Sequence, residues 1–405
     1  SSDLVAHIKG LDPAKAVFIT GTNGKSTSTN MIHHILTHAG HSVCSNLKGA
    51  NLLTGVATSL LSDCSLSGRL KAEYVVMETD ERYLKMIRAQ LPARFQCITN
   101  IQKDQAQRNG EPSFILRKVA EALDPSVILF ANTDDPNTLF LSSIPNRSVY
   151  YGVSENSKSF RKDDDFFSVG MPCPKCHNPI TFHTYNIDNI GPFTCECCGF
   201  GRDRAPDYLA SDIRYEERTF RVGDTTYAFH FNTPYFLYCY TLAIAVTTEF
   251  GLTAPEISAA LDAFSDIRGR IETRELAGKT IHYIKVKQEN SETVQSALNL
   301  TSQDRRSKVF MIGYDEYLDF YPPMLLNFYP FDYDTRGLLE SNVDKWICMS
   351  EAMGRACAVR FLYDGFDESD MIVLPNSQEA TIAAALANTS AENAYLIEEI
   401  PYWKK

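Results

Sequence analysis

The chain has 405 residues, is 44% hydrophobic and 22% charged, and carries a net charge of −11 at pH 7. This length predicts two or three domains with buried cores, and the lack of a Lys/Arg cluster argues against nucleic acid as a partner. No apolar run approaches the roughly 20 residues that span a bilayer, and residues 1–9 lack a signal-peptide core, which predicts a cytoplasmic protein.

The first element with a chemical signature is the segment Val17–Thr29, which reads VFITGTNGKSTST. Its pattern predicts a strand and a glycine turn, followed by a helix over Asn30–His38. Gly21 and Gly24 allow a tight turn whose N–H groups face a phosphate, while Lys25 adds a cation and Ser26 a hydroxyl ligand for Mg²⁺. Only two residues separate the glycines, fewer than in the usual phosphate loop, so a chance glycine-rich turn is the alternative. The flanking strand and helix favour a nucleoside triphosphate loop.

A second apolar strand, Tyr74–Met77, is followed directly by Glu78. Ligands of open α/β sheets bind at the carboxyl ends of the strands, and an acidic group there can hold Mg²⁺ beside phosphates. The alternative is that acidic residues simply begin a helix at Arg82. That alternative fits Asp80 and Glu81 better than Glu78, which we therefore assign to the metal.

Two further strands are predicted at Cys97–Ile101 and Val127–Phe130, and polar segments follow them at 102–111 and 131–136. Both polar segments follow the carboxyl end of a strand, which favours a place in the same crevice as the phosphate loop. A solvated loop or a plain turn would show the same composition. Four strands that alternate with helices predict a parallel, doubly wound sheet. A long helix is predicted over Phe236–Phe250.

Four of the eleven cysteines follow the pattern C-x₂-C-x₁₈-C-x₂-C, namely Cys173, Cys176, Cys195 and Cys198. Thiolates at this spacing surround one Zn²⁺ tetrahedrally, and the metal supplies folding energy to a segment with few apolar residues. Disulfides are the alternative, and His177 and Cys197 are spare ligands by residue type. The sequence predicts a structural zinc ribbon inserted at about residues 160–225.

A second α/β pattern begins near Leu276. Its predicted strands are Thr280–Ile284, Lys308–Ile312 and Ala394–Glu398, and its predicted helices are Ser291–Leu298 and Ser377–Ala387. The aromatic run Phe320–Tyr333 indicates core or domain-contact surface, or a partner-binding patch if it is exposed.

The segments Gly21–Thr27, Glu78, Thr99–Asn100 and Asn132–Pro136 occur in the order of the Mur ligase central domain, and the chain resembles that family. Mur ligases phosphorylate a carboxylate with ATP and let an amine attack the acyl phosphate. The resemblance implies an α/β fold with a Mur-ligase-type central ATPase domain at 1–273, which contains the ribbon, and an α/β C-terminal domain at 274–405.

A closer resemblance is to the MurT-like subunits of lipid II isoglutaminyl synthase. It rests on the cysteine insertion and on Ala50–Leu53, Glu78–Glu81, Asp104–Gln105, Arg108 and Gly110–Glu111. Like those subunits, the chain is expected to lack the N-terminal substrate domain of ordinary Mur ligases. The resemblance implies amidation of D-glutamate in lipid II at the inner face of the membrane, within a heterodimer whose GatD-like glutaminase supplies ammonia.

The resemblance also implies roles for individual residues. The ATP-binding set is Thr22, Asn23, Gly24, Lys25, Ser26, Thr27, Asn132, Asp135 and Arg270, of which Arg270 alternatively pairs with Glu272. The Mg²⁺ set is Ser26, Glu78 and Gln105. The catalytic set is Glu78, Asp104 and Asp332, the last of which would complete the glutaminase site.

Two other functions stay open. One is a Mur- or folylpolyglutamate-type ligase that adds an amino acid, against which the short N-terminus and the ribbon argue. The other is a nucleotide-dependent interaction subunit without turnover. The intact Lys25, Ser26 and Glu78 argue against this second function, whereas departures from the family pattern in the C-terminal third favour it.

Overall fold

The computed structural model describes residues 8–47, 50–104, 111–161, 171–187, 189–202, 205–231, 234–264, 271–287, 290–314 and 329–398. The chain forms two compact units, one of residues 1–102 and 109–265 and the other of residues 103–108 and 266–405. The expected boundary after residue 273 thus falls inside the second unit. Among the described residues, no helix combines the length and apolar character needed to cross a membrane.

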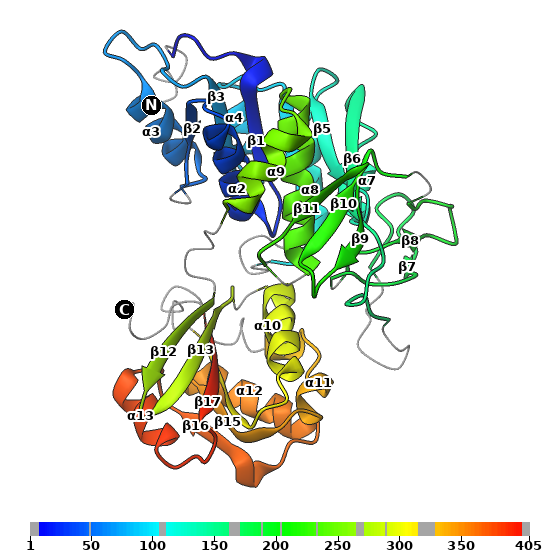
Figure 1. Cartoon of the computed structure of the whole chain (residues 1–405). Coiled ribbons are helices and arrows are strands. Elements are labelled where there is room, and N and C mark those ends of the chain that lie inside the picture. Colours follow the sequence, from blue (N-terminus) through cyan, green and yellow to red (C-terminus); the bar gives the residue numbers. More distant parts are fainter. Residues whose placement is uncertain are drawn as a thin grey trace. The chain divides into compact units, whose positions relative to one another are not determined.

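A nine-stranded sheet is the centre of the first unit, in the order β11-β10-β9-β6-β5-β4-β1-β3-β2 (Figure 1). Its strands are β1 (Ala16–Thr20), β2 (Val43–Ser45), β3 (Tyr74–Glu78), β4 (Phe95–Ile98), β5 (Ile128–Asn132), β6 (Arg147–Val153), β9 (Tyr208–Arg214), β10 (Thr219–Val222) and β11 (Thr225–Ala228). The seven strands β2, β3, β1, β4, β5, β6 and β9 are neighbours in this order and are parallel. The strands β10 and β11 extend the sheet beyond β9 and are antiparallel.

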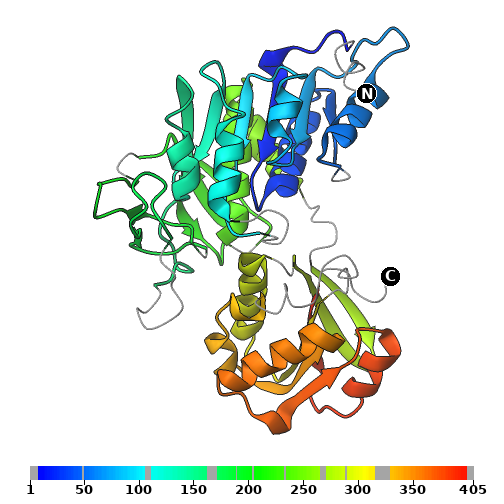
Figure 2. The ribbon, with the colours of Figure 1, turned by 180° about the vertical axis from the view of Figure 1, so that it is seen from behind.

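Helices cover both faces of this sheet. They are α2 (Lys25–His38), α3 (Leu53–Asp63), α4 (Leu84–Arg88), α6 (Pro112–Ala120), α7 (Pro136–Leu141), α8 (Pro234–Glu249) and α9 (Ala254–Asp262), with the short 3-10 turn η1 (Pro13–Lys15) before β1. The helices α2, α8 and α9 pack together on one face (Figure 1), and α4 and α6 lie on the other (Figure 2). The predicted doubly wound sheet is confirmed.

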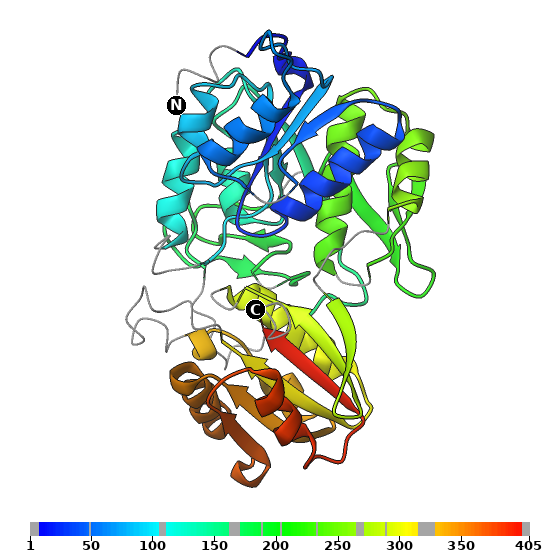
Figure 3. The same cartoon turned by 90° about the vertical axis from the view of Figure 1, so that its left-hand side faces the viewer.

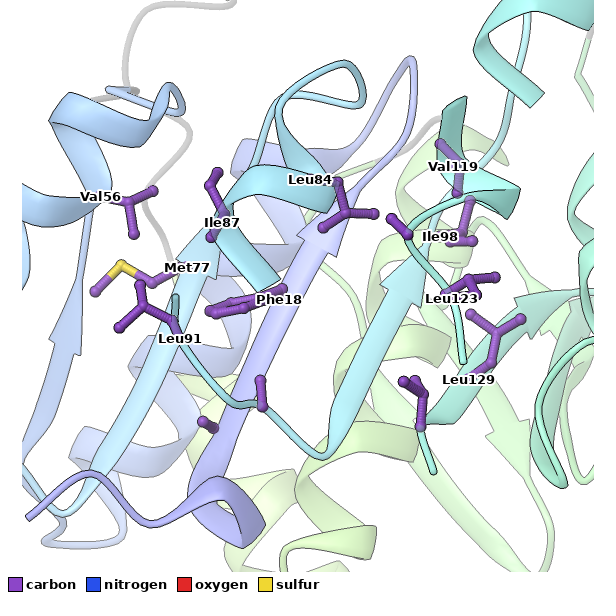
Figure 4. Close-up of a cluster of buried hydrophobic side chains, with 14 of the residues drawn as sticks. Phe18, Val56, Met77, Leu84, Ile87, Leu91, Ile98, Val119, Leu123 and Leu129 are labelled. Atoms are coloured by element: carbon purple, nitrogen blue, oxygen red, sulfur yellow. The ribbon is translucent and has the colours of Figure 1, made fainter. Parts of the chain in front are cut away.

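Burial on both faces explains why β1 is apolar from Ala16 to Ile19. Successive side chains of a strand point to opposite faces, so Phe18 enters the core beneath α3, α4 and α6, while Val17 and Ile19 face α2. Figure 4 shows Phe18 among Val56, Met77 and Ile87 in that core.

The helix after the phosphate loop begins at Lys25, with Gly24 as its N-cap, rather than near the expected Asn30. Hydroxyl-bearing residues such as Thr27 and Ser28 have low helix propensity, but their burial overrides that preference. The strands β9 and β10 lie in a range that was expected to belong to the insertion, and they extend the main sheet instead.

The insertion itself is a small ribbon of residues 171–202 with two short strands, β7 (Thr181–Phe182) and β8 (Phe193–Thr194). Its core contains the buried Cys173, Ile180, Phe193 and Cys195, and Leu139 of α7 packs against them. So small a core needs a further source of folding energy.

The second unit has a six-stranded sheet in the order β12-β13-β17-β14-β15-β16, with β12 antiparallel and the others parallel (Figure 3). Its strands are β12 (Ile271–Leu276), β13 (Lys279–Lys285), β14 (Lys308–Gly313), β15 (Val343–Met349), β16 (Met371–Leu374) and β17 (Asn393–Glu398). Its helices are α10 (Ser291–Gln303), α11 (Arg336–Leu339), α12 (Glu351–Tyr363) and α13 (Glu379–Leu386), with the 3-10 turns η4 (Tyr329–Phe331) and η5 (Glu368–Asp370).

All three strands and both helices expected in this unit are present. Of the aromatic run, Tyr329 and Tyr333 are buried in the core, as expected for core residues. Residues 320–328 of the run lie outside the described residues.

Candidate functional site

The glycine loop lies at the carboxyl edge of the sheet, directly after β1. Gly21 has a φ of 126°, and a Cβ there would lie 2.3 Å from Thr99 Oγ1, so a side chain is excluded. Asn100 at the end of β4 holds the loop: its carbonyl accepts the Thr22 N–H at 2.8 Å, and its side-chain oxygen accepts the Asn23 N–H at 3.0 Å. The loop conformation is therefore fixed by the neighbouring strand as well as by its glycines.

Lys25 is buried and is held by an acidic side chain. Its Nζ lies 2.8 Å from Glu81 Oε1 and also donates to the carbonyls of Gly21 and Thr22. The same Glu81 oxygen accepts the Gly21 N–H at 3.1 Å. Glu81 thus joins the lysine to the start of the loop, a role that sequence reasoning missed when it assigned this residue to a helix start. Its position three residues after Glu78, at the same strand end, was the available signal.

We expect Glu81→Ala to lower the free energy of unfolding by about 3 kcal/mol, because it leaves the buried Lys25 ammonium without its carboxylate. Urea unfolding of the purified chain measures this loss. The control is Glu73→Ala, which removes the carboxylate that pairs with Lys15 and His41 at a much more exposed position and should cost little. Equal losses in the two variants would contradict the structural role of Glu81.

Ser26 and Glu78, two of the predicted Mg²⁺ ligands, are in contact. Ser26 Oγ donates to Glu78 Oε2 at 2.7 Å, and Asn51 donates to the other carboxylate oxygen at 3.1 Å. The Asn46 side chain bonds the N–H and the carbonyl of Glu78, each at 2.8 Å. A hydroxyl and a carboxylate at a phosphate loop are the oxygen donors that Mg²⁺ prefers, so these residues fit the ion. Gln105, the third predicted ligand, lies outside the described residues.

The other members of the predicted ATP set lie around this loop. Thr22, Asn23 and Thr27 are buried beside Lys25. Arg270 lies outside the described residues.

Asn132 and Asp135 are almost completely buried at the end of β5, and their side chains bond to backbone. Asn132 donates to the Thr99 carbonyl at 3.1 Å, whereas Asp135 accepts the Ile101 N–H at 2.7 Å and caps α7. Burial raises the pKa of Asp135 to about 7. These contacts fix the ends of β4 and β5 relative to each other, and the predicted contact of both residues with the nucleotide stays a prediction.

Asp104 and Asp332, the other predicted catalytic carboxylates, both belong to the second unit. Lys103 Nζ lies 2.8 Å from Asp332 Oδ2. Asp104 lies 3.6 Å from Lys287 Nζ and accepts the Asn290 amide at 3.2 Å. Each carboxylate therefore has a cationic partner. The adjacent residues Lys103 and Asp104 take part in both pairs, Lys103 with Asp332 and Asp104 with Lys287.

The four predicted zinc ligands form one cluster, with all their sulfur atoms within 4.8 Å of one another. Two of the separations are 3.8 Å (Cys173–Cys198) and 3.5 Å (Cys176–Cys195). Zn–S bonds of about 2.3 Å in a tetrahedron place sulfur atoms about 3.8 Å apart, so the cluster fits zinc. All eleven cysteines are free thiols, which contradicts the disulfide alternative, and neither His177 nor Cys197 belongs to the cluster.

Known proteins resemble this chain in sequence and in fold. Residues 19–191 match the Mur ligase middle domain. The chain is 25% identical over 303 residues to the protein named lipid II isoglutaminyl synthase (glutamine-hydrolyzing) subunit MurT of Staphylococcus aureus, covering 74% of this chain and 67% of that one. It is 27% identical over 275 residues to the subunit of the same name from Streptococcus pneumoniae, covering 67% of this chain and 61% of that one.

A solved structure, the pseudomurein peptide ligase type C from Methanothermus fervidus, has the same fold, with a TM-score of 0.73 at 19% identity over 96% of this chain and 77% of that one. The chain spans about two thirds of the length of the two curated relatives. The protein is thus a Mur-ligase-like α/β protein that carries a Mur ligase middle domain and is similar to MurT subunits over most of its length.

Proposed function

We propose that the protein is the ligase subunit of an ATP-dependent amide synthase that converts D-glutamate of a lipid II-type precursor to D-isoglutamine. The names of its relatives support this substrate and reaction. The observation that carries the proposal is the meeting of Lys25, Ser26 and Glu78 at the carboxyl edge of a parallel sheet, where such groups bind the phosphates and metal of Mg-ATP.

The chemistry proceeds in two steps. The γ-phosphoryl group of ATP passes to a carboxylate oxygen of the acceptor, and ADP leaves. Ammonia then attacks the acyl carbon, phosphate leaves with that oxygen, and the nitrogen loses a proton to give the amide. Lys25 and the N–H groups at the start of α2 stabilise the charge of the transferring phosphoryl group. Ser26 and Glu78 would hold Mg²⁺, which when bound would supply positive charge next to the phosphates.

The remaining parts follow from the same proposal. Cys173, Cys176, Cys195 and Cys198 hold a structural Zn²⁺. Ammonia comes from a GatD-like glutaminase in a heterodimer, consistent with the word "subunit" in the names of the relatives. The lipid-linked acceptor places the reaction at the inner, cytoplasmic face of the membrane.

The direct test is ATP hydrolysis and product formation on a lipid II-type acceptor with ammonium chloride as the nitrogen source. We expect ADP and an amidated acceptor, identified by mass spectrometry, in equal amounts. Turnover that requires an amino acid instead of ammonium would indicate a Mur- or folylpolyglutamate-type ligase. Binding of ATP without turnover on such acceptors would indicate a non-catalytic subunit.

Asp332→Asn tests the proposed link to a glutaminase. If Asp332 completes the partner's site, this variant should lose glutamine-dependent amidation by at least about tenfold in the heterodimer yet keep amidation from free ammonium. Asp334→Asn is the matched control, because Asp334 is a neighbouring carboxylate that pairs with Arg336. Equal glutamine and ammonium activities in Asp332→Asn would exclude a role for Asp332 in ammonia supply.

A further inference from the structure

Asp134 is a fully buried carboxylate next to the candidate nucleotide site. Its Oδ1 lies 2.6 Å from Arg202 Nη1, and its Oδ2 accepts the Tyr238 hydroxyl at 2.8 Å and the Val153 N–H at 2.9 Å. Burial raises the pKa of Asp134 above its ordinary value, and the charge of Arg202 opposes this rise. A buried charge that depends on one cation makes that cation structurally important.

The cation comes from the cysteine ribbon. Besides Arg202, the ribbon contributes the Gly191 N–H, which donates to the Asp134 carbonyl at 3.0 Å. A third ribbon residue, Asn186, donates to the Tyr238 hydroxyl and to the Val153 carbonyl, each at 3.0 Å. The ribbon is therefore joined to the first unit through a connected, buried polar network in addition to the packing of Leu139.

The same network continues towards the glycine loop. Asp134 lies between Asn132 and Asp135, which bind the backbone on either side of Asn100, and Asn100 in turn holds Asn23. Tyr238 also lines the small cavity behind the loop, together with Asn23 and Gly24.

A second route leads from the ribbon to the loop. The Gln102 side chain donates to the Asn189 carbonyl of the ribbon at 3.4 Å, and its N–H donates to Thr22 Oγ1 at 2.9 Å. Two sets of contacts thus connect the ribbon with Thr22 and Asn23 of the loop.

We propose that the cysteine ribbon is a positioning element of the nucleotide site, with Arg202 as its key residue. By neutralising Asp134, Arg202 holds the ends of β4 and β5 in the arrangement that fixes the glycine loop, and the fixed loop directs the N–H groups at the start of α2 towards phosphate. The inference rests on the proposed function, because it assumes that the glycine loop binds a nucleotide. A ribbon that served solely as a docking module for another protein would leave nucleotide affinity unchanged when this contact is removed.

The test compares Arg202→Ala with wild type in the full, zinc-loaded chain. We expect Arg202→Ala to keep its zinc and its fold, to bind Mg-ADP at least tenfold more weakly in calorimetry, and to exchange the amide hydrogens of residues 22–24 faster. Arg202→Lys should recover most of the affinity, because it restores the charge. The control Arg214→Ala removes an exposed arginine of β9 and should behave as wild type.

Tyr238→Phe is a milder variant in case Arg202→Ala does not fold, since it removes a single hydroxyl from Asp134. It should weaken Mg-ADP binding severalfold and speed the same amide exchange. Folded variants with wild-type affinity and wild-type exchange would overturn the inference alone. Wild-type protein that fails to bind Mg-ADP would overturn the proposed function, and the inference with it.

Discussion

Lys25→Ala is expected to reduce ATP-dependent amidation at least about a hundredfold, because it removes the cation that we propose binds the transferring phosphoryl group. Lys25 is buried and is the first residue of α2, directly after the glycine loop. The measurement is ADP release and amide formation on a lipid II-type acceptor with saturating ammonium.

The control for this variant is Lys15→Ala, which removes a half-exposed lysine of the same unit that pairs with Glu73. It should leave turnover unchanged. Because Lys25→Ala also leaves the Glu81 carboxylate buried without its partner, the double variant Lys25→Ala/Glu81→Gln separates lost chemistry from lost stability. If the double variant is folded and still turns over at the wild-type rate, Lys25 is not the phosphate-binding cation.

The second large effect is expected from Cys173→Ser. Cys173 is completely buried in the small ribbon core, and a serine there removes one of four thiolates from the cluster. We expect bound zinc to fall from about one per chain to none, because a structural site needs all four ligands. The ribbon would then lose the metal that stabilises it, and limited proteolysis should cut within residues 171–202.

Cys197→Ser is the matched control for the zinc site. Cys197 is an exposed neighbour of the ligand Cys198 and does not belong to the cluster. Its replacement should leave zinc content and protease resistance unchanged. Full zinc occupancy in Cys173→Ser, measured by elemental mass spectrometry, would refute the four-cysteine assignment.

Local sequence was sufficient for the motifs. The glycine loop and the four-cysteine pattern could be predicted because each depends on residues within a few positions of one another, where spacing alone restricts geometry. The strands β1, β3, β4 and β5 were predictable for a similar reason, since burial on both faces demands continuous apolar runs. The hairpin β10–β11 was missed because its strands alternate buried and partly exposed residues. Such short strands lack the continuous apolar run that marks a strand buried on both faces.

The partners of these motifs were decided by tertiary structure alone. Glu81 reaches Lys25 across 56 positions, Arg202 reaches Asp134 across 68, and Asn100 reaches Asn23 across 77. Those pairings follow from the strand order, which places the ends of β3 and β4 on either side of β1, and from the docking of the ribbon beside β5 and β6. The sequence by itself determined which chemical groups the site contains, whereas the order of the strands determined which of them touch, because contacts between distant segments depend on the packing of the whole sheet rather than on local spacing.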